Sequence, residues 1–248
     1  MLKQFALALL FVILSAGCSD NQSAPAKRPV TPLDLSTVGS VGGRVQFEGA
    51  APQPAALKLG SFAECAAQHD GPIYPDDVVV KDGSLANVLV YVTNGLGVRS
   101  FAVPEAPVVI DQKGCVFVPR VAGAQSGQPI RFMNGDPLVH NVHGVPQIAS
   151  GWNFMLPVRG AARNVTIDKP EAVIELKCDI HPWMKAYLGV FDHPYFAVTG
   201  ADGKFELRNL PPGDYEIAAW HERLGTSSAR VSLAPKEAKE ISFSFPNK

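Results

Sequence analysis

Three side chains that can bind a soft metal ion lie within one short segment. Cys178, His181 and Met184 have the spacing C-x-x-H-x-x-M, between the apolar runs AVIEL and AYLGV. Apolar runs of this length are typical of strands, so the three side chains lie on one strand-to-strand loop and can converge. A further imidazole, that of His140, precedes Cys178 by 38 residues and could supply a fourth ligand.

A thiolate, two imidazoles and a thioether are the ligands of a blue-copper electron-transfer site. Sulfur ligands stabilise Cu(I), and imidazole binds both oxidation states of copper. Zinc rarely takes a thioether, and an iron–sulfur cluster needs about four cysteines, whereas at most three remain after Cys18. The donor set indicates one copper ion. A single Cys or Met is also common in a hydrophobic core, which leaves a metal-free sandwich as the alternative.

Two segments resemble the cupredoxins, the blue copper proteins that include amicyanin, pseudoazurin and plastocyanin. One is His140–His143, with the sequence HNVH, and the other is Cys178–Met184. The matched region covers less than half of the chain, from about residue 78 to residue 192. The resemblance implies one copper ion whose ligands are His140, Cys178, His181 and, axially, Met184.

The same resemblance implies roles for neighbouring residues. It implies that Asn141 joins the two ligand loops by hydrogen bonds and that Pro182 follows the ligand histidine. Val139 departs from the family, which usually has Pro there, and this affects the rigidity of the loop more than its ligands. By analogy, the ligand nearest to solvent would be His181, beside a candidate apolar docking surface of Pro146, Pro182 and Trp183.

The remaining histidines have less specific surroundings. His143 is three residues past His140, and odd spacing on a strand turns it to the opposite face, which favours a structural or surface role. His193 and His221 could form a second metal site with His69 or His143, although packing and surface positions are commoner for single histidines.

Cys18 ends a segment with the pattern of an export signal. Lys3 precedes an apolar run over residues 5–14, which is too short for a membrane span of about 20 residues. The sequence SAGC at residues 15–18 resembles the lipidation site of bacterial lipoproteins, although such signals usually have Leu in place of Ser15. We expect a signal peptide over residues 1–17, lipidation of Cys18 and a flexible tether over residues 18–37. A cleaved signal that leaves Cys18 as a free thiol is the alternative.

Cys65 and Cys115 remain. In an exported protein, two leftover cysteines favour a disulfide, which here closes a loop of 50 residues. The alternative is that Cys65 and His69 belong to a second copper site.

The elements that must hold these residues are predominantly strands. Short apolar runs alternate with turns rich in Gly and Pro, of which the chain has 22 and 21. Asp82-Gly83 and Lys113-Gly114 each separate two such runs and predict hairpins, while residues 61–71 could hold one short helix. The pattern predicts an all-β fold with a Greek-key β-sandwich. The expected strands are 43–49, 78–80, 88–92, 108–110, 116–118, 130–133, 139–142, 165–167, 172–178, 187–191, 195–199, 204–210, 215–220, 229–233 and 240–245.

The C-terminal part differs in character. The segments DGKF at 202–205 and LPPGDY at 210–215 resemble the carboxypeptidase regulatory-like family, a small transthyretin-like β-sandwich. We expect a cupredoxin-like copper domain with an N-terminal extension over residues 38–192 and this β module over residues 193–248. Because the strand near residue 43 also resembles the opening strand of such modules, the first domain could instead be inserted into the second.

Composition narrows the function further. A formal charge of −1 provides no basic field for nucleic acid, and 46% hydrophobic residues exclude an intrinsically disordered chain. We expect a lipid-anchored electron carrier of the bacterial periplasm rather than an enzyme, with redox proteins as partners and the membrane reached through the anchor. The alternatives are a Cu(I)-binding protein for copper delivery or storage and a metal-free structural or adhesion module.

Overall fold

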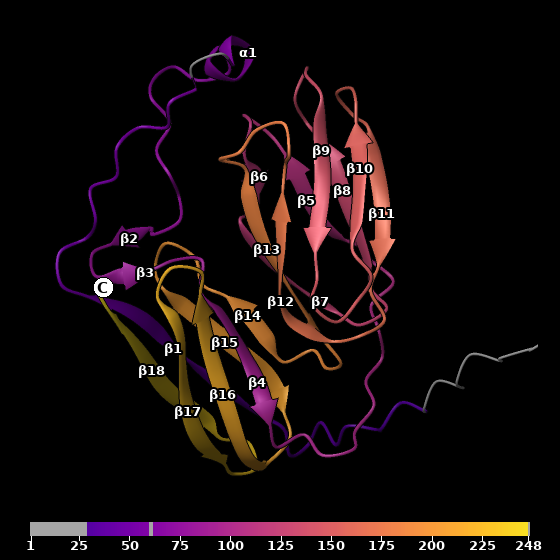
Figure 1. The fold of residues 1–248 in the computed structure, drawn as a ribbon. Helices are drawn as coiled ribbons and strands as arrows, with labels where there is room; N and C mark the ends of the chain where they lie inside the picture. Colours follow the sequence, from indigo (N-terminus) through magenta and orange to yellow (C-terminus); the bar gives the residue numbers. More distant parts are fainter. Residues whose placement is uncertain (1–28, 60–61, 248) are drawn as a thin grey trace, which may run out of the picture.

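The computed structural model describes residues 29–59 and 62–247 (Figure 1). The expected signal peptide, Cys18 and the first part of the expected tether lie outside these residues. The described end of the tether is held against the body, since the Thr31 N–H donates to the carbonyl of Ser100 at 2.8 Å and the Thr31 hydroxyl accepts the Ser100 N–H at 3.0 Å. Among the described helices, none has the length and apolar character that a membrane span requires.

The fold is all-β, as the sequence predicts, and its sheets pack as two sandwiches (Figure 1). The first, here called the central sandwich, has one sheet in the order β10-β9-β12-β13-β7 and another in the order β11-β8-β5-β6. Its strands are β5 (Val108–Gln112), β6 (Phe117–Val118), β7 (Val121–Gln125), β8 (Pro129–Asn134), β9 (His140–Val145), β10 (Trp152–Leu156), β11 (Ala162–Thr166), β12 (Glu171–Lys177) and β13 (Lys185–Phe191).

The second, here called the terminal sandwich, uses strands from both ends of the described chain. One sheet has the order β15-β1-β3-β2 with β18 also paired to β1, and the other has the order β14-β4-β16-β17. Its strands are β1 (Gly39–Glu48), β2 (Val80–Lys81), β3 (Ser84–Leu85), β4 (Leu89–Asn94), β14 (Phe196–Val198), β15 (Lys204–Leu210), β16 (Gly213–His221), β17 (Gly225–Leu233) and β18 (Ala238–Pro246).

Strand pairing crosses the boundary expected at residue 192. β1 runs parallel to β18 and antiparallel to β15, and β4 is antiparallel to β14 and β16. Since β1 and β4 both precede the central sandwich, that sandwich lies in the chain between two parts of the terminal one. The strand pairing therefore corresponds to a central sandwich inserted into the terminal one, and not to two domains that follow each other in the chain.

Each sandwich encloses its own hydrophobic core. Ile110, Phe132, Ile174 and Leu188 are fully buried in the central core, while the inward side chains of β1, β4, β15, β16, β17 and β18 form the terminal core. A small third cluster of Leu89, Val121 and Phe191 joins β4 to β7 and β13. The cores follow from the alternation of apolar residues along the strands, because successive side chains of a strand point to opposite faces.

The single described helix, α1 (Ala63–Ala66), confirms the short helix expected within residues 61–71. It lies in the long connection between β1 and β2. Figure 1 places it beyond the loops at the end of the central sandwich that is farther from the terminal sandwich. The metal-ligand candidates, at the start of β9 and in the loop between β12 and β13, lie at this same end.

Most expected strands are present, and three observed strands, β3, β7 and β10, were missed. β3, rather than the run expected at 88–92, pairs with β2 across the Asp82-Gly83 turn. β15 has the predicted bounds, and the Asp82-Gly83 hairpin has the positive φ angles, 50° and 74°, of a tight turn. β7 was missed because its small residues are buried on both faces and show no alternation. β10 was missed because its sequence WNFML is apolar at every position except Asn153, so the alternation of buried and exposed side chains does not show in the residue types.

Candidate metal centre

Neighbouring strands bring the expected ligands together. His140 is the first residue of β9, and β12 ends one residue before Cys178. β9 and β12 pair in one sheet, so the start of one strand lies beside the end of the other. The loop from Cys178 is closed by its own backbone, since the N–H of Cys178 donates to the carbonyl of Met184 at 3.2 Å and the N–H of Met184 donates to that of His181 at 2.9 Å.

Three of the four predicted ligand side chains converge in this structure. The Sγ of Cys178 lies 3.6 Å from Nδ1 of His181 and 4.0 Å from Nδ1 of His140. The two Nδ1 atoms are 3.0 Å apart, and all three donor atoms lie within 4.8 Å of one another. The set is closed to solvent, with exposed fractions of 0% for His140 and 2% each for Cys178 and His181.

Met184 belongs to the same buried group. Its side chain is 1% exposed and packs in the central core with Cys178. The short loop places this thioether three residues after His181. Its assignment as the axial ligand stays a prediction.

A carboxylate that the sequence analysis missed orients His140. Asp136 Oδ2 accepts the Nε2–H of His140 at 2.8 Å, and both side chains are fully buried. The same carboxylate accepts the N–H groups of Gly114 at 2.7 Å and Cys115 at 2.8 Å. A proton held on Nε2 leaves Nδ1 as the free donor atom of His140, which is the nitrogen that faces Cys178.

Asn141 joins the two ligand loops, as the resemblance implies. Its Oδ1 accepts the N–H of Asp179 at 2.7 Å and lies 3.3 Å from Sγ of Cys178. Its amide Nδ2 donates to Asn153 at 2.8 Å and to the Asp179 carboxylate at 3.0 Å. Pro182, the other neighbour singled out from the sequence, is exposed on the loop.

The electrostatics of the group favour a thiolate. Burial by itself raises the pKa of Cys178, but hydrogen bonds from His140 and His181 outweigh it and lower this pKa to about 6. Burial opposes protonation of His140, yet Asp136 and Cys178 together raise its pKa. Burial also works against the charge of Asp136, while His140 and the two backbone N–H groups lower its pKa. A metal ligand must be deprotonated, so a thiolate near neutral pH is ready to bind.

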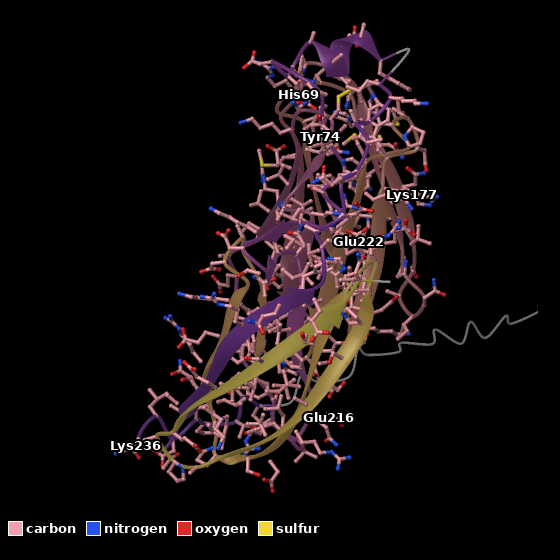
Figure 2. The ribbon with its side chains drawn as sticks, turned by 90° about the vertical axis from the view of Figure 1, so that its left-hand side faces the viewer. His69, Tyr74, Lys177, Glu216, Glu222 and Lys236 are labelled. Atoms are coloured by element: carbon pink, nitrogen blue, oxygen red, sulfur yellow. A yellow bond between two sulfur atoms is a disulfide. The ribbon has the colours of Figure 1, made fainter. Side chains whose placement is uncertain are left out.

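The predicted disulfide between Cys65 and Cys115 is present. It ties α1 to the turn between β5 and β6, and Figure 2 shows it as a yellow bond just below the helix. His69, the partner of Cys65 in the alternative copper site, instead points its Nε2 to the carbonyl of Gly114 at 2.8 Å. Gln68 adds a weak contact, donating from Nε2 to Sγ of Cys115 at 3.6 Å.

The segment around α1 covers the ligand expected to lie nearest to solvent. The Phe62 ring packs edge-on against the His181 ring at 5.1 Å between centroids, and the Trp183 ring lies 5.3 Å from it. His181 is therefore buried, and the expectation of a solvent-facing imidazole edge is wrong. The long connection between β1 and β2, which sequence reasoning did not place, supplies the cover.

The other histidines lie apart from this group. His143 is half-buried at the surface and its Nδ1 hydrogen-bonds to the Asp179 carboxylate at 3.0 Å, which fits its expected surface role. His193 contacts the carbonyl of Val92, and His221 accepts the N–H of Arg223. Among the described residues, the clusters that could hold a metal include neither His193 nor His221.

Comparison with known proteins gives only weak matches. No family model matches the chain, and no curated protein matches it. Among solved structures it is similar to a purple cupredoxin from Nitrosopumilus maritimus, with 16% identity over 34% of this chain and 98% of that one and a TM-score of 0.29.

Two further solved structures are similar at the same level. An amicyanin mutant in the Cu(I) form has 18% identity over 39% of this chain and 96% of that one, with a TM-score of 0.31. A Cu-containing nitrite reductase from Thermus scotoductus has 19% identity over 59% of this chain, which spans only 28% of the reductase, with a TM-score of 0.31. Similarity this low carries no argument about function, so the case for a metal rests on the side chains of this chain.

Proposed function

We propose that this protein binds one copper ion through His140, Cys178, His181 and Met184 and carries single electrons. The observation that supports this most directly is the convergence of a buried thiol of lowered pKa with two buried imidazole nitrogens. One nitrogen donor is already oriented by a carboxylate, and outer hydrogen bonds of this kind are typical of metal-binding histidines. The residues therefore fit a copper ion.

When bound, copper would supply a one-electron couple between Cu(I) and Cu(II). The chain's own residues would hold the donor atoms still while the charge of the site changes. Asp136 fixes the ring of His140, Asn141 links the two loops, and the loop from Cys178 to Met184 closes on its own backbone. Burial of every expected ligand excludes water from the site and limits its reorganisation.

Burial of the ligands also favours an electron carrier over a protein that transfers its copper ion to a partner protein. A delivery site must let a partner reach the ion, whereas here Phe62 and Trp183 pack over His181. We further propose that the protein works in the bacterial periplasm, held at the membrane by lipid on Cys18, with redox proteins as partners. A Cu(I)-handling role and a metal-free role are the alternatives that the following experiment separates.

The test is the visible spectrum of the protein from residue 19 onward after loading with Cu(II). We expect an intense thiolate-to-copper band near about 600 nm, lost in Cys178→Ser and in His140→Gln. His143→Gln is the matched control, because His143 is outside the ligand group, and it should keep the band. Stoichiometric copper without the band would refute the electron-carrier proposal. A Cu(I) complex that shows no reversible wave in voltammetry would favour copper handling, and a protein that binds no copper would favour the metal-free role.

A further inference from the structure

None of the expected ligands presents its own surface to a redox partner. His140, Cys178, His181 and Met184 are at most 2% exposed. Electron tunnelling weakens steeply with distance and is strongest through bonded or closely packed atoms. An electron must therefore leave through a side chain that contacts a ligand and also reaches solvent.

Two aromatic rings, those of Phe62 and Trp183, contact His181, and they belong to different segments of the chain. Phe62 belongs to the connection that precedes α1, which the disulfide fastens over the site. Trp183 is two residues from His181 in the ligand loop itself, with its ring 5.3 Å away. Its indole N–H donates to the carbonyl of Cys115 at 2.9 Å, which fixes the orientation of the ring.

Trp183 also lines an open cavity of about 270 Å³. Tyr74, Arg120, Tyr187 and Glu222 also line it, so the cavity extends from the ligand loop toward β16 of the terminal sandwich. In Figure 2, Tyr74 lies between the α1 end of the molecule and Glu222. A molecule in this cavity would touch the indole without disturbing the ligands.

The charges of the cavity wall are paired. Arg120 binds the carboxylate of Glu222 with two nitrogens and also contacts Asp76, and Arg223 lies 3.5 Å from Asp77. Tyr187 packs on Trp220 with ring centroids 5.1 Å apart, which extends the aromatic surface beyond Trp183.

We propose that Trp183 is the electron exit of the site and that the electron is transferred in the cavity that Trp183 lines. This inference rests on the proposed copper function. With copper bound, the contact between His181 and Trp183 would carry one electron from Cu(I) to a one-electron oxidant in the cavity, and the copper would become Cu(II). The oxidant, for example hexacyanoferrate(III), gains that electron, and no bond or proton is exchanged.

The first test is the rate at which hexacyanoferrate(III) oxidises the copper-loaded, reduced protein in a stopped-flow instrument. We expect Trp183→Leu to slow oxidation at least severalfold while the visible band and the midpoint potential stay as in the wild type. Trp152→Leu is the matched control, because Trp152 is also a half-buried tryptophan of the central sandwich but packs on β9 and the core. The control should oxidise at the wild-type rate.

A second test leaves Trp183 intact and therefore does not depend on how its variant folds. Lys185 is exposed at the cavity, so a bulky maleimide on Lys185→Cys should block access and slow oxidation. The same label on Lys169→Cys, at an exposed turn before β12, should have no effect. If the label on Lys185→Cys slows oxidation and the label on Lys169→Cys does not, the proposed exit is supported even if Trp183→Leu fails to bind copper.

The outcomes separate this inference from the function on which it rests. A wild-type protein without the thiolate band would overturn both. A normal band with oxidation rates that neither Trp183→Leu nor the cavity label changes would overturn the exit alone. Equal slowing by both labels would also overturn it, since the effect would not depend on the cavity.

Discussion

Asp136 provides the sharpest test of how the site is held. Its carboxylate accepts three hydrogen bonds, from Nε2 of His140 and from the backbone N–H groups of Gly114 and Cys115. Both it and His140 are fully buried. In Asp136→Asn one oxygen becomes an NH₂ group, so at least one of the three donors faces another donor and the two remaining bonds lose their charge.

The expected cost follows from these contacts. A buried donor left without an acceptor costs about 1–3 kcal/mol, and a hydrogen bond to a charged group contributes about 1 kcal/mol more than a neutral one. We therefore expect the free energy of unfolding of the metal-free protein to fall by about 3–5 kcal/mol. Because an oriented imidazole binds metal more tightly, copper affinity should fall by about 10- to 100-fold.

Urea unfolding of the metal-free protein and competition with a copper chelator measure these two quantities. Asp34→Asn is the control, since the Asp34 carboxylate also accepts a backbone N–H, that of Ser36 at 3.0 Å, but at the exposed surface and outside the ligand loops, where water can replace the lost acceptor and the cost is small. If Asp136→Asn matched this control in both assays, the claim that Asp136 positions His140 would be wrong.

Three further results are expected. Replacing Cys65 and Cys115 by serine should destabilise the fold by up to about 4 kcal/mol, from the entropy of a 50-residue loop, as measured by urea unfolding of the double variant against the unreduced wild type. Burial lowers the pKa of His221 to about 4, so the unfolded chain takes up a proton first as the pH falls below about 6.5. The free energy of unfolding should thus fall by roughly 3 kcal/mol between pH 7 and pH 4 because of His221. Urea unfolding at both pH values should show a smaller fall for His221→Leu than for the wild type. An equal fall in the two proteins would contradict the role given to His221. Arg120→Met leaves the buried carboxylate of Glu222 unpaired and should cost about 3–5 kcal/mol, and the double variant with Glu222→Gln should recover part of this in thermal melts.

Much of the fold and of the site was predictable because it depends on short-range patterns. Alternating apolar residues and tight-turn sequences predicted most strands, including β15 with its bounds. The spacing from Cys178 to Met184 predicted the ligand loop, since a loop closed by its own backbone has few arrangements. β7 escaped prediction because a strand buried on both faces has no alternation to detect.

Other features required contacts between distant segments. Asp136 lies four residues before His140, a spacing that could have drawn notice, but its role depends on the Gly114–Cys115 turn that it also binds. Phe62 covers His181 from a segment 119 residues away in the chain. β1 pairs with β18 across nearly the whole described length, and local sequence carries no information about such a partner.

The sequence by itself determined the all-β class, the expected donor set of one Cys, two His and one Met, and the two cysteines that form the disulfide. These depend on residue type and local spacing, which the chain displays directly. Only the tertiary structure decided that His181 is covered, that Asp136 holds His140, and that Trp183 connects the ligand loop to a cavity. Each of these is a contact between side chains brought together by sheet pairing and packing, and burial exists only once the chain has folded.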